Sequence, residues 1–302
     1  IDSIFLAGDN VYSYNVPKNK LIEIIESKKK LPTKEQYKND PSISSQYIEK
    51  QLSQGFLDCF SNSNIKNFYI ALGNHDVQNC HDLNTQLNYN LIHKNELEEK
   101  KLNYTIPSTY YNVIYNLKDY SINFIVIDTN MYSEDTTCNP KITYSAQNKL
   151  DQKKWVINTL KTNETTWNII IGHIPYFAKG HKEKNPNIFN KDIDDLFKSI
   201  EESKCPIVQV YMCADEHNQQ FLQYNNINLV VAGSGGTALD KLYEKSSVET
   251  KYEKSTFGFT SFSFHKEKLS ITYIQTNPFL SPSISYKVHI DTTGQIVKDK
   301  HF

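Results

Sequence analysis

The sequence predicts a layered α/β fold in a single domain. Short apolar runs typical of strands alternate with segments whose apolar residues recur every three or four positions, as on amphipathic helices. In the last third, residues 257–273 change to an alternation of two, which is typical of half-buried antiparallel strands. A chain of 302 residues can bury one large core, so we expect one domain over residues 1–302.

In the first half of the chain, three short apolar runs predict buried strands, and each continues directly into a polar loop. They span residues 4–7, 68–72 and 123–127. Apolar residues at helical spacing predict helices at 21–25 and 48–60. Loops that follow strands in this way often carry catalytic side chains.

In the second half, helices and strands alternate more regularly. Ser145 is a candidate cap for a helix whose apolar positions lie at 150–160, and a strand is expected at 168–171. Apolar residues recur at three and four positions in 193–200, which predicts another amphipathic helix before a strand at 207–213. This alternation favours a layered fold over a helical bundle or a pure sandwich.

The charge balance argues against nucleic acid as a partner. The chain carries 33 Lys and no Arg against 34 acidic residues, a formal net charge of -1. It therefore lacks the side chain that reads guanine or phosphate through two parallel hydrogen bonds. No run approaches about 18 apolar residues, so we expect no membrane span within this sequence. The composition does not indicate an oligomeric state.

The cysteines and glycosylation sequons bear on the compartment. Five cysteines form no Cys-x-x-Cys pair, which argues against a zinc knuckle or a redox dithiol, and their odd number leaves at least one free thiol. Sequons begin at Asn103 and Asn163. They are compatible with a secreted glycoprotein, although asparagine is frequent enough here to give sequons by chance. We therefore slightly favour secretion or an endomembrane lumen.

Four short segments place a candidate metal ligand directly after an apolar run. They span residues 8–12, 73–76, 172–173 and 214–218. Each alone has an ordinary structural explanation, since a carboxylate at a strand end often caps a helix and an isolated histidine is often only hydrogen-bonded. An open sheet brings the carboxyl ends of its strands into one crevice, so the four together predict one site.

The order of these motifs resembles the calcineurin-like metallophosphoesterases. Gly-Asp-Asn-x-Tyr, Gly-Asn-His-Asp, Gly-His-x-Pro and a final His-Asn follow one another as in that family. Tyr12, three residues after Asp9, resembles the purple (tartrate-resistant-type) acid phosphatase branch. Residues 106–111, 126–129 and 231–236 resemble supporting segments of the family. The resemblance implies a layered β-sandwich flanked by helices (αββα), with the family's first strand unit missing from this sequence.

The resemblance also implies a centre of two metal ions, iron plus a divalent ion such as Mn, Fe, Zn or Mg. Asp9 would bridge both, because an anionic oxygen offsets the repulsion of two cations about 3.5–4 Å apart. Tyr12 would bind the first metal as a phenolate, which needs a strongly acidic ion such as Fe(III), since an ordinary tyrosine has a pKa of about 10. Asn74 and His173 would bind the second metal, and His217 the first.

The activity that the resemblance implies is hydrolysis of a small phosphate monoester. A metal-bound hydroxide would attack phosphorus in line while the metals neutralise charge on the phosphoryl oxygens. His75 would protonate the departing alkoxide. His181 would help to hold the substrate or share the proton, although a solvated loop histidine is an equally good interpretation.

Two departures from the family bear on this activity. The aspartate that the family carries one strand unit before Asp9 has no counterpart here, so we expect the chain to be truncated at its N-terminus. Asp215 stands where the family has a histidine ligand of the second metal. A carboxylate also coordinates metals, and as a harder donor it moves the preference from zinc towards manganese, magnesium or iron.

Three functions therefore stay open. They are a phosphomonoesterase, a phosphodiesterase or nucleotide hydrolase on the same scaffold, and a catalytically degenerate member that acts as a binding or scaffold module. Retention of Tyr12 and His75 favours activity, whereas the altered last motif and the missing first motif favour degeneration. The candidate substrate-selecting loops, residues 179–190 and 240–254, carry only scattered charges and do not identify the substrate.

Overall fold

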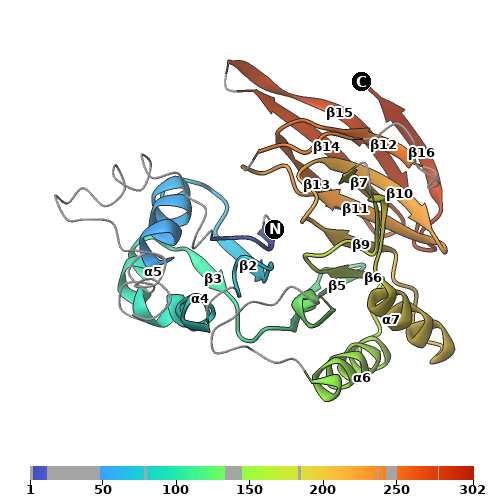
Figure 1. Ribbon diagram of the computed structural model, residues 1–302, viewed down its shortest axis with the longest axis horizontal. Coiled ribbons are helices and arrows are strands. Elements are labelled where there is room, and N and C mark those ends of the chain that lie inside the picture. The colour runs from blue at the N-terminus through green and yellow to red at the C-terminus, as the bar shows by residue number, and fades with distance from the viewer. Residues whose placement is uncertain are drawn as a thin grey trace. The chain divides into compact units, whose positions relative to one another are not determined.

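The computed structural model describes residues 3–11, 48–77, 80–132, 145–182, 185–236, 238–242, 250–277 and 279–302. The chain forms two compact units (Figure 1): unit 1 comprises Ile1–Thr109 with Ser133–Tyr144, and unit 2 comprises Tyr110–Tyr132 with Ser145–Phe302. The expected single domain over residues 1–302 stays a prediction.

Unit 1 is built on three parallel strands in the order β1-β2-β3. Its elements are β1 (Ser3–Ala7), the π-helical η1 (Ser53–Asp58), β2 (Asn67–Ala71), α4 (Cys80–Ile92), α5 (Lys94–Lys100) and β3 (Asn103–Thr105). Parallel neighbours need a crossover connection, which α4 and α5 supply between β2 and β3. The strands predicted at 4–7 and 68–72 and the helix predicted at 48–60 are confirmed, whereas the helix expected at 21–25 lies outside the described residues.

Aromatic side chains fill the core of unit 1. Phe56 of η1 lies edge-on to Phe68 of β2, with 4.6 Å between ring centroids, and to Tyr104 of β3 at 5.4 Å. Tyr89 of α4 packs against Tyr104 at 4.9 Å. These contacts hold the helices against the strands and so fix the strand ends from which the loops of the site emerge.

Unit 2 contains a seven-stranded sheet of order β12-β10-β11-β9-β6-β5-β4. Its central strands pair in parallel, and β4, β10 and β12 pair antiparallel at the two sides. The strands are β4 (Tyr111–Asn116), β5 (Ser121–Val126), β6 (Trp167–Ile171), β9 (Val210–Cys213), β10 (Gln219–Tyr224), β11 (Ile227–Ala232) and β12 (Thr250–Lys254). The strands predicted at 123–127, 168–171 and 207–213 are confirmed, the last beginning at Val210.

Two helices of unit 2 pack on this sheet. They are α6 (Ala146–Thr162) and α7 (Lys191–Glu202), and a short 3₁₀ helix, η2, spans Thr129–Tyr132. Ser145 caps α6 as predicted, and Asn148 returns the hydrogen bond to the backbone of Ser145. The apolar face of α7 is buried in the core with β-strand residues such as Tyr211 and Leu229. Helical periodicity therefore located both helices correctly.

A second, antiparallel sheet of four strands lies in the order β13-β14-β15-β16. Its strands are β13 (Gly258–Phe264), β14 (Leu269–Asn277), β15 (Leu280–Ile290) and β16 (Ile296–His301), and a separate hairpin comprises β7 (Phe177–Lys182) and β8 (Asn185–Phe189). The Tyr273 hydroxyl donates to the Gln220 carbonyl oxygen at 2.5 Å, which ties this sheet to the seven-stranded one. Unit 2 is therefore a two-sheet sandwich with helices on one side, and the predicted layered α/β class is confirmed.

The cysteines and the helix lengths bear on two further expectations from the sequence. Among the described residues, Cys59, Cys205 and Cys213 are free thiols, so the prediction of at least one free cysteine is confirmed. In the same residues no helix combines the length and the apolar character needed to cross a membrane.

Candidate metal centre

In unit 1 two loops leave neighbouring parallel strands at the same end of the sheet. β1 pairs with β2 over their full length, from Ser3 with Asn67 to Ala7 with Ala71. Asp9 follows β1 in the left-handed region, with φ 55, and its Oδ1 accepts the His75 backbone N–H at 3.0 Å. The structure therefore brings Asp9 next to the turn that carries His75.

Gly73 allows this close approach. A Cβ atom at Gly73 would collide with the backbone nitrogen and the Oδ1 atom of Asp9. No side chain fits there without moving the Asp9 loop, which gives the first glycine of the Gly-Asn-His-Asp motif a steric explanation. The turn is closed by a hydrogen bond from the Asp76 backbone N–H to the Gly73 carbonyl oxygen at 3.2 Å.

Asp76 holds the two loops together. This fully buried carboxylate accepts hydrogen bonds from the backbone N–H groups of Gly73 (2.8 Å), Asn10 (3.2 Å) and Val11 (3.0 Å) and from the Asn10 side-chain amide (2.9 Å). Burial, and next the Asp9 carboxylate, raise the pKa of Asp76 to about 7, while the backbone donors act in the opposite direction. Asp76 is therefore a positioning residue, which the sequence analysis included only as part of the Gly-Asn-His-Asp motif. The sequence feature that could have revealed this role is a carboxylate at the end of a tight turn, where backbone N–H groups need an acceptor.

Of the other residues predicted in unit 1, Asn74 and His75 lie half-buried in this turn. The structure therefore places Asp9 beside the turn that contains Asn74 and His75, and their roles at a metal centre stay predictions. Tyr12 lies outside the described residues, and its role as a phenolate ligand stays a prediction.

In unit 2 the loops after β6 and β9 carry the remaining residues that the sequence predicts as ligands, and these strands are also parallel neighbours. His173 is almost fully buried, and its Nε2 atom lies 3.4 Å from Oδ1 of Asp215, whose side chain is 36% exposed. The backbone of Asp215 adopts φ 58, a left-handed conformation that is uncommon for residues other than glycine. The structure thus pairs an imidazole with a carboxylate at the carboxyl ends of two central strands of the sheet.

Thr129 fixes the backbone of His173. Its hydroxyl oxygen accepts the N–H groups of His173 at 3.1 Å and Ile174 at 3.0 Å. A Cβ atom at Gly172 would meet the Thr129 methyl group and the Tyr211 hydroxyl oxygen, so this position also requires glycine. The predicted Gly-His motif is therefore shaped by a residue more than 40 positions earlier in the chain.

His217 is oriented by the segment that follows the glycine-rich strand exit. Its Nδ1 atom lies 2.9 Å from the Ala238 carbonyl oxygen, and its backbone N–H donates to Asp240 Oδ2 at 3.0 Å. Because a carbonyl only accepts, Nδ1 carries the proton and Nε2 keeps the lone pair that a metal needs. Asp240 was missed as a functional residue, since nothing in its local sequence links it to His217.

His181 departs from the loop position expected for it. Its backbone belongs to β7, in the β7–β8 hairpin, and its side chain lies outside the described residues. Its suggested part in holding substrate stays a prediction.

The donor set fits metal ions of the expected kind. Imidazole nitrogen suits Zn and Fe, and carboxylate and amide oxygens suit Mg, Mn and Fe. Within the described residues, no group of three or more His, Cys, Asp or Glu side chains gathers into a complete cluster.

Comparisons with known proteins identify relatives of this chain. A model of the calcineurin-like phosphoesterases matches residues 1–233. Tartrate-resistant acid phosphatase type 5 of Rattus norvegicus is 24% identical over 246 residues, which cover 76% of this chain and 70% of that protein. The Homo sapiens protein of the same name is 22% identical over 249 residues, with the same coverage.

Solved structures share the fold at lower identity. PhoD superposes with a TM-score of 0.61 at 14% identity, over 99% of this chain and 66% of PhoD. Purple acid phosphatase PPD1 from yellow lupin gives 0.54 at 13% identity, over 99% of this chain and 46% of that one. GAP50, the anchor in the inner membrane complex of Plasmodium, gives 0.52 at 16% identity, over 90% of this chain and 85% of GAP50.

Proposed function

Because the chain belongs to the calcineurin-like phosphoesterase family, we propose that it hydrolyses small phosphate monoesters with the help of two metal ions. The family model covers residues 1–233, and the matched acid phosphatases confirm the likeness to the purple acid phosphatase branch. The activity on monoesters and the identity of the metals, iron with a divalent ion, are the parts that we propose.

One observation carries the proposal: buried His173 and left-handed Asp215 present Nε2 and Oδ1 atoms 3.4 Å apart at the ends of adjacent parallel strands. A neutral imidazole and a carboxylate side by side are a typical pair of ligands for a divalent cation. We assign the metal ligands to Asp9, Tyr12, Asn74, His173, Asp215 and His217.

The chain's own residues have separate tasks in this reaction. Bound metal ions supply a nucleophile at neutral pH by acidifying water, and they offset charge on the phosphoryl oxygens. His75 gives a proton to the departing oxygen of the ester. Asp76 keeps the turn that carries His75 against Asp9, because four donors from the two loops converge on its carboxylate. The buried position of His173 keeps water away from its ring.

Metal content and phosphate release test the proposal together. The purified chain, supplied with iron and manganese, is expected to bind metal and to release phosphate from an aryl phosphate. His173→Ala should lower both, whereas His265→Ala, at an exposed hairpin position, should change neither. Metal binding without release from any phosphate ester would overturn the proposed activity, and faster release from a diester would favour a phosphodiesterase.

Two substitutions test the identity of the metals. If Tyr12 binds Fe(III), the iron-loaded protein should show a visible charge-transfer band that is absent in Tyr12→Phe. Asp215→His should move the metal preference towards zinc, because imidazole is a softer donor than carboxylate. If Asp215→Ala left stoichiometry, preference and turnover at their original values, Asp215 would not be a ligand.

A second candidate function is that of a catalytically degenerate binding or anchoring protein. The replacement of a family histidine by Asp215 favours it, and GAP50, of similar fold, is named as an anchor. Unchanged binding of metal together with absent turnover on monoesters, diesters and nucleotides would support this candidate over the enzyme.

We further propose secretion or an endomembrane lumen as the location, from the two sequons. The Asn103 side chain is exposed, and its amide nitrogen donates to Asn67 Oδ1 at 2.8 Å. Treatment of the native protein with an N-glycosidase should lower its mass, and an unchanged mass would remove this argument.

A further inference from the structure

The outer face of the four-stranded sheet carries apolar and basic side chains in neighbouring rows. Phe259, Ile274 and Ile284 lie directly opposite one another on β13, β14 and β15. The next row on the same face ends in Lys287 of β15 opposite Lys300 of β16. Side chains of paired residues point to the same face, so the register alone sets these rows side by side. On the opposite face Ile271, Tyr273 and Val288 are buried.

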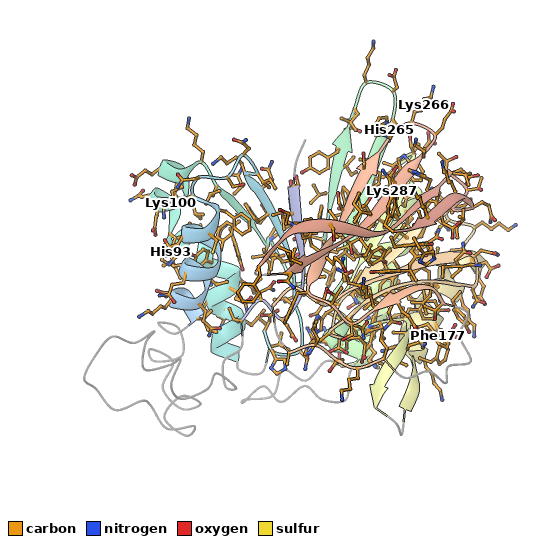
Figure 2. All side chains as sticks on the ribbon, turned by 90° about the horizontal axis from the view of Figure 1, so that it is seen from above. His93, Lys100, Phe177, His265, Lys266 and Lys287 are labelled. Carbon is orange, nitrogen blue, oxygen red and sulfur yellow. The ribbon has the colours of Figure 1, made fainter. Side chains whose placement is uncertain are left out.

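The lysines of this face are not neutralised by the protein. Among the described residues, no ion pair involves the five lysines of this sheet: Lys266, Lys268, Lys287, Lys298 and Lys300. Figure 2 labels Lys287, which belongs to β15. The register places it opposite Lys300 of β16, and like charges directly opposite one another destabilise a sheet. Lys298 lies opposite His289, whose ring nitrogen is within hydrogen-bonding distance of the Ser270 hydroxyl at 2.7 Å. A surface that keeps like charges opposite one another is suited to an anionic partner.

The acidic groups of the sheet do not balance these lysines. Asp299 is turned to the other face, where the Tyr286 hydroxyl donates to it at 3.4 Å. Asp291 sits in the β15–β16 turn and accepts hydrogen bonds from Thr293 and Gln295. Glu267, in the β13–β14 hairpin, lies between Lys266 and Lys268 in sequence. The excess of positive charge is felt at His289, whose pKa is lowered by burial and by Lys268, Lys287 and Lys298.

The apolar end of the face extends into the β14–β15 hairpin. Phe279 is 91% exposed and Leu280 71% exposed at its tip. Phe259 (51%) and Ile284 (41%) continue the apolar surface towards the lysines. Exposed aromatic and aliphatic side chains next to lysines are the features of proteins that lie on a membrane surface, with apolar groups at the headgroup boundary and lysines on anionic lipid.

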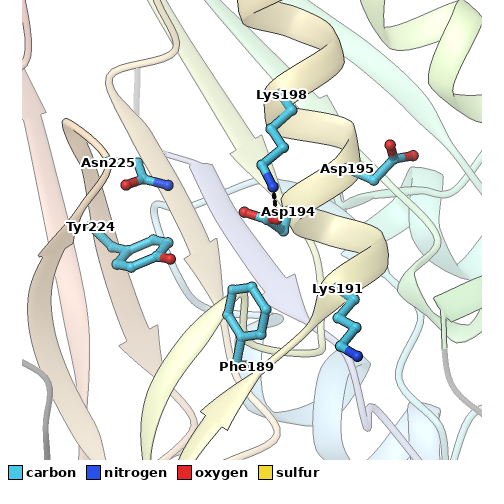
Figure 3. Close-up of a pocket in the computed structure, with 7 residues that line it drawn as sticks. All are labelled: Phe189, Lys191, Asp194, Asp195, Lys198, Tyr224 and Asn225. Carbon is cyan, nitrogen blue, oxygen red and sulfur yellow. Dashed lines mark ion pairs between the residues drawn. The ribbon is translucent and has the colours of Figure 1, made fainter.

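We propose that this face docks on a membrane surface that contains anionic phospholipids. A cavity of about 560 Å³ lies beside α7, and there Lys198 is paired with Asp194 at 2.7 Å (Figure 3). Unlike the lysines of the sheet, this lysine is neutralised by the protein. The docking proposal is independent of the proposed phosphatase activity.

Sedimentation with lipid vesicles tests the proposal on the whole chain. Binding is expected to vesicles of phosphatidylcholine with phosphatidylserine, to weaken as salt is raised, and to be much lower on phosphatidylcholine alone, because the attraction to anionic lipid is screened by salt. Equal binding to both kinds of vesicle, or none to either, would overturn it.

Matched variants locate the surface. Lys287→Gln and Lys300→Gln should each lower the partition coefficient about fivefold, the contribution expected of one lysine at an anionic membrane. Lys154→Gln and Lys161→Gln, at exposed positions of α6, are controls that should leave it unchanged. Phe279→Ser should weaken binding while leaving its salt dependence intact. Equal losses in the α6 controls, or no loss in the sheet variants, would show that another surface is used.

Discussion

The loops of unit 1 and those of unit 2 are held in place by different chemistry. In unit 1 one buried carboxylate, Asp76, accepts four hydrogen bonds from two loops. In unit 2 the neutral hydroxyl of Thr129 accepts two, at His173 and Ile174. Asp76 accepts more hydrogen bonds than Thr129 does, and in its ionised form each of them is about twice as strong as a bond between neutral groups. The loops of unit 1 therefore depend more strongly on Asp76 than the loop of unit 2 depends on Thr129.

The largest expected difference between the units is in what a histidine substitution removes: turnover in unit 1 and metal binding in unit 2. His75→Ala in unit 1 should lower turnover roughly 10²–10⁴-fold on an ester with a poor leaving group, the range of general acid catalysis, with metal content intact. An activated aryl phosphate should lose less. His173→Ala in unit 2 should lose metal instead. Equal losses of His75→Ala on both substrates, measured by steady-state kinetics, would contradict the proton-donor role.

Removal of the Asp76 carboxylate should be the most costly change to stability. Asp76→Ala leaves three backbone N–H groups without their acceptor and the Asn10 amide with only its bond to the Ala71 carbonyl oxygen. We expect a loss of about 3–5 kcal/mol in the free energy of unfolding. Asp76→Asn keeps the shape and one acceptor oxygen, so its loss should be smaller. Urea denaturation followed by circular dichroism measures both, and faster amide exchange should be confined to residues 8–11 and 72–77. Uniform exchange along the chain would contradict a local role.

The corresponding change in unit 2 should cost less. Thr129→Val preserves the shape but leaves the N–H groups of His173 and Ile174 without the hydroxyl, for an expected loss of about 1–3 kcal/mol. Thr129→Ser retains the hydroxyl and is the matched control. If the valine variant lost as much unfolding free energy as Asp76→Ala in the same urea experiment, the contrast between the units would be wrong.

The smallest expected effect concerns the orientation of His217. Asp240→Ala removes the acceptor of the His217 backbone N–H but leaves the hydrogen bond to Ala238, so manganese affinity should fall roughly tenfold, at the low end for such supporting residues. Titration calorimetry with manganese measures this. Asp240→Asn keeps an acceptor oxygen, so its manganese affinity should lie between that of the alanine variant and that of the unaltered protein. An affinity unchanged in the alanine variant would show that Ala238 alone orients the ring.

The sequence by itself determined where most strands and helices lie, because apolar periodicity and caps act over a few neighbouring residues. The strand before Gly73, the Ser145 cap and the apolar face of α7 were all visible in this way. The order of motifs also determined the family, which the match over residues 1–233 confirms. Where periodicity was weak, prediction was poorer: the segment that contains His181 is a hairpin strand and not the expected loop.

Only the tertiary structure decided which side chains act on one another across the chain. Asp76 bonds to Asn10 and Val11, and Asp240 to His217, over separations that no local pattern encodes. The pairing of Lys287 with Lys300 depends on the register between β15 and β16, which shifts between His289 and Ile290. A shift of one residue in register moves every side chain to the other face, so the charge of that face follows from strand pairing and not from composition.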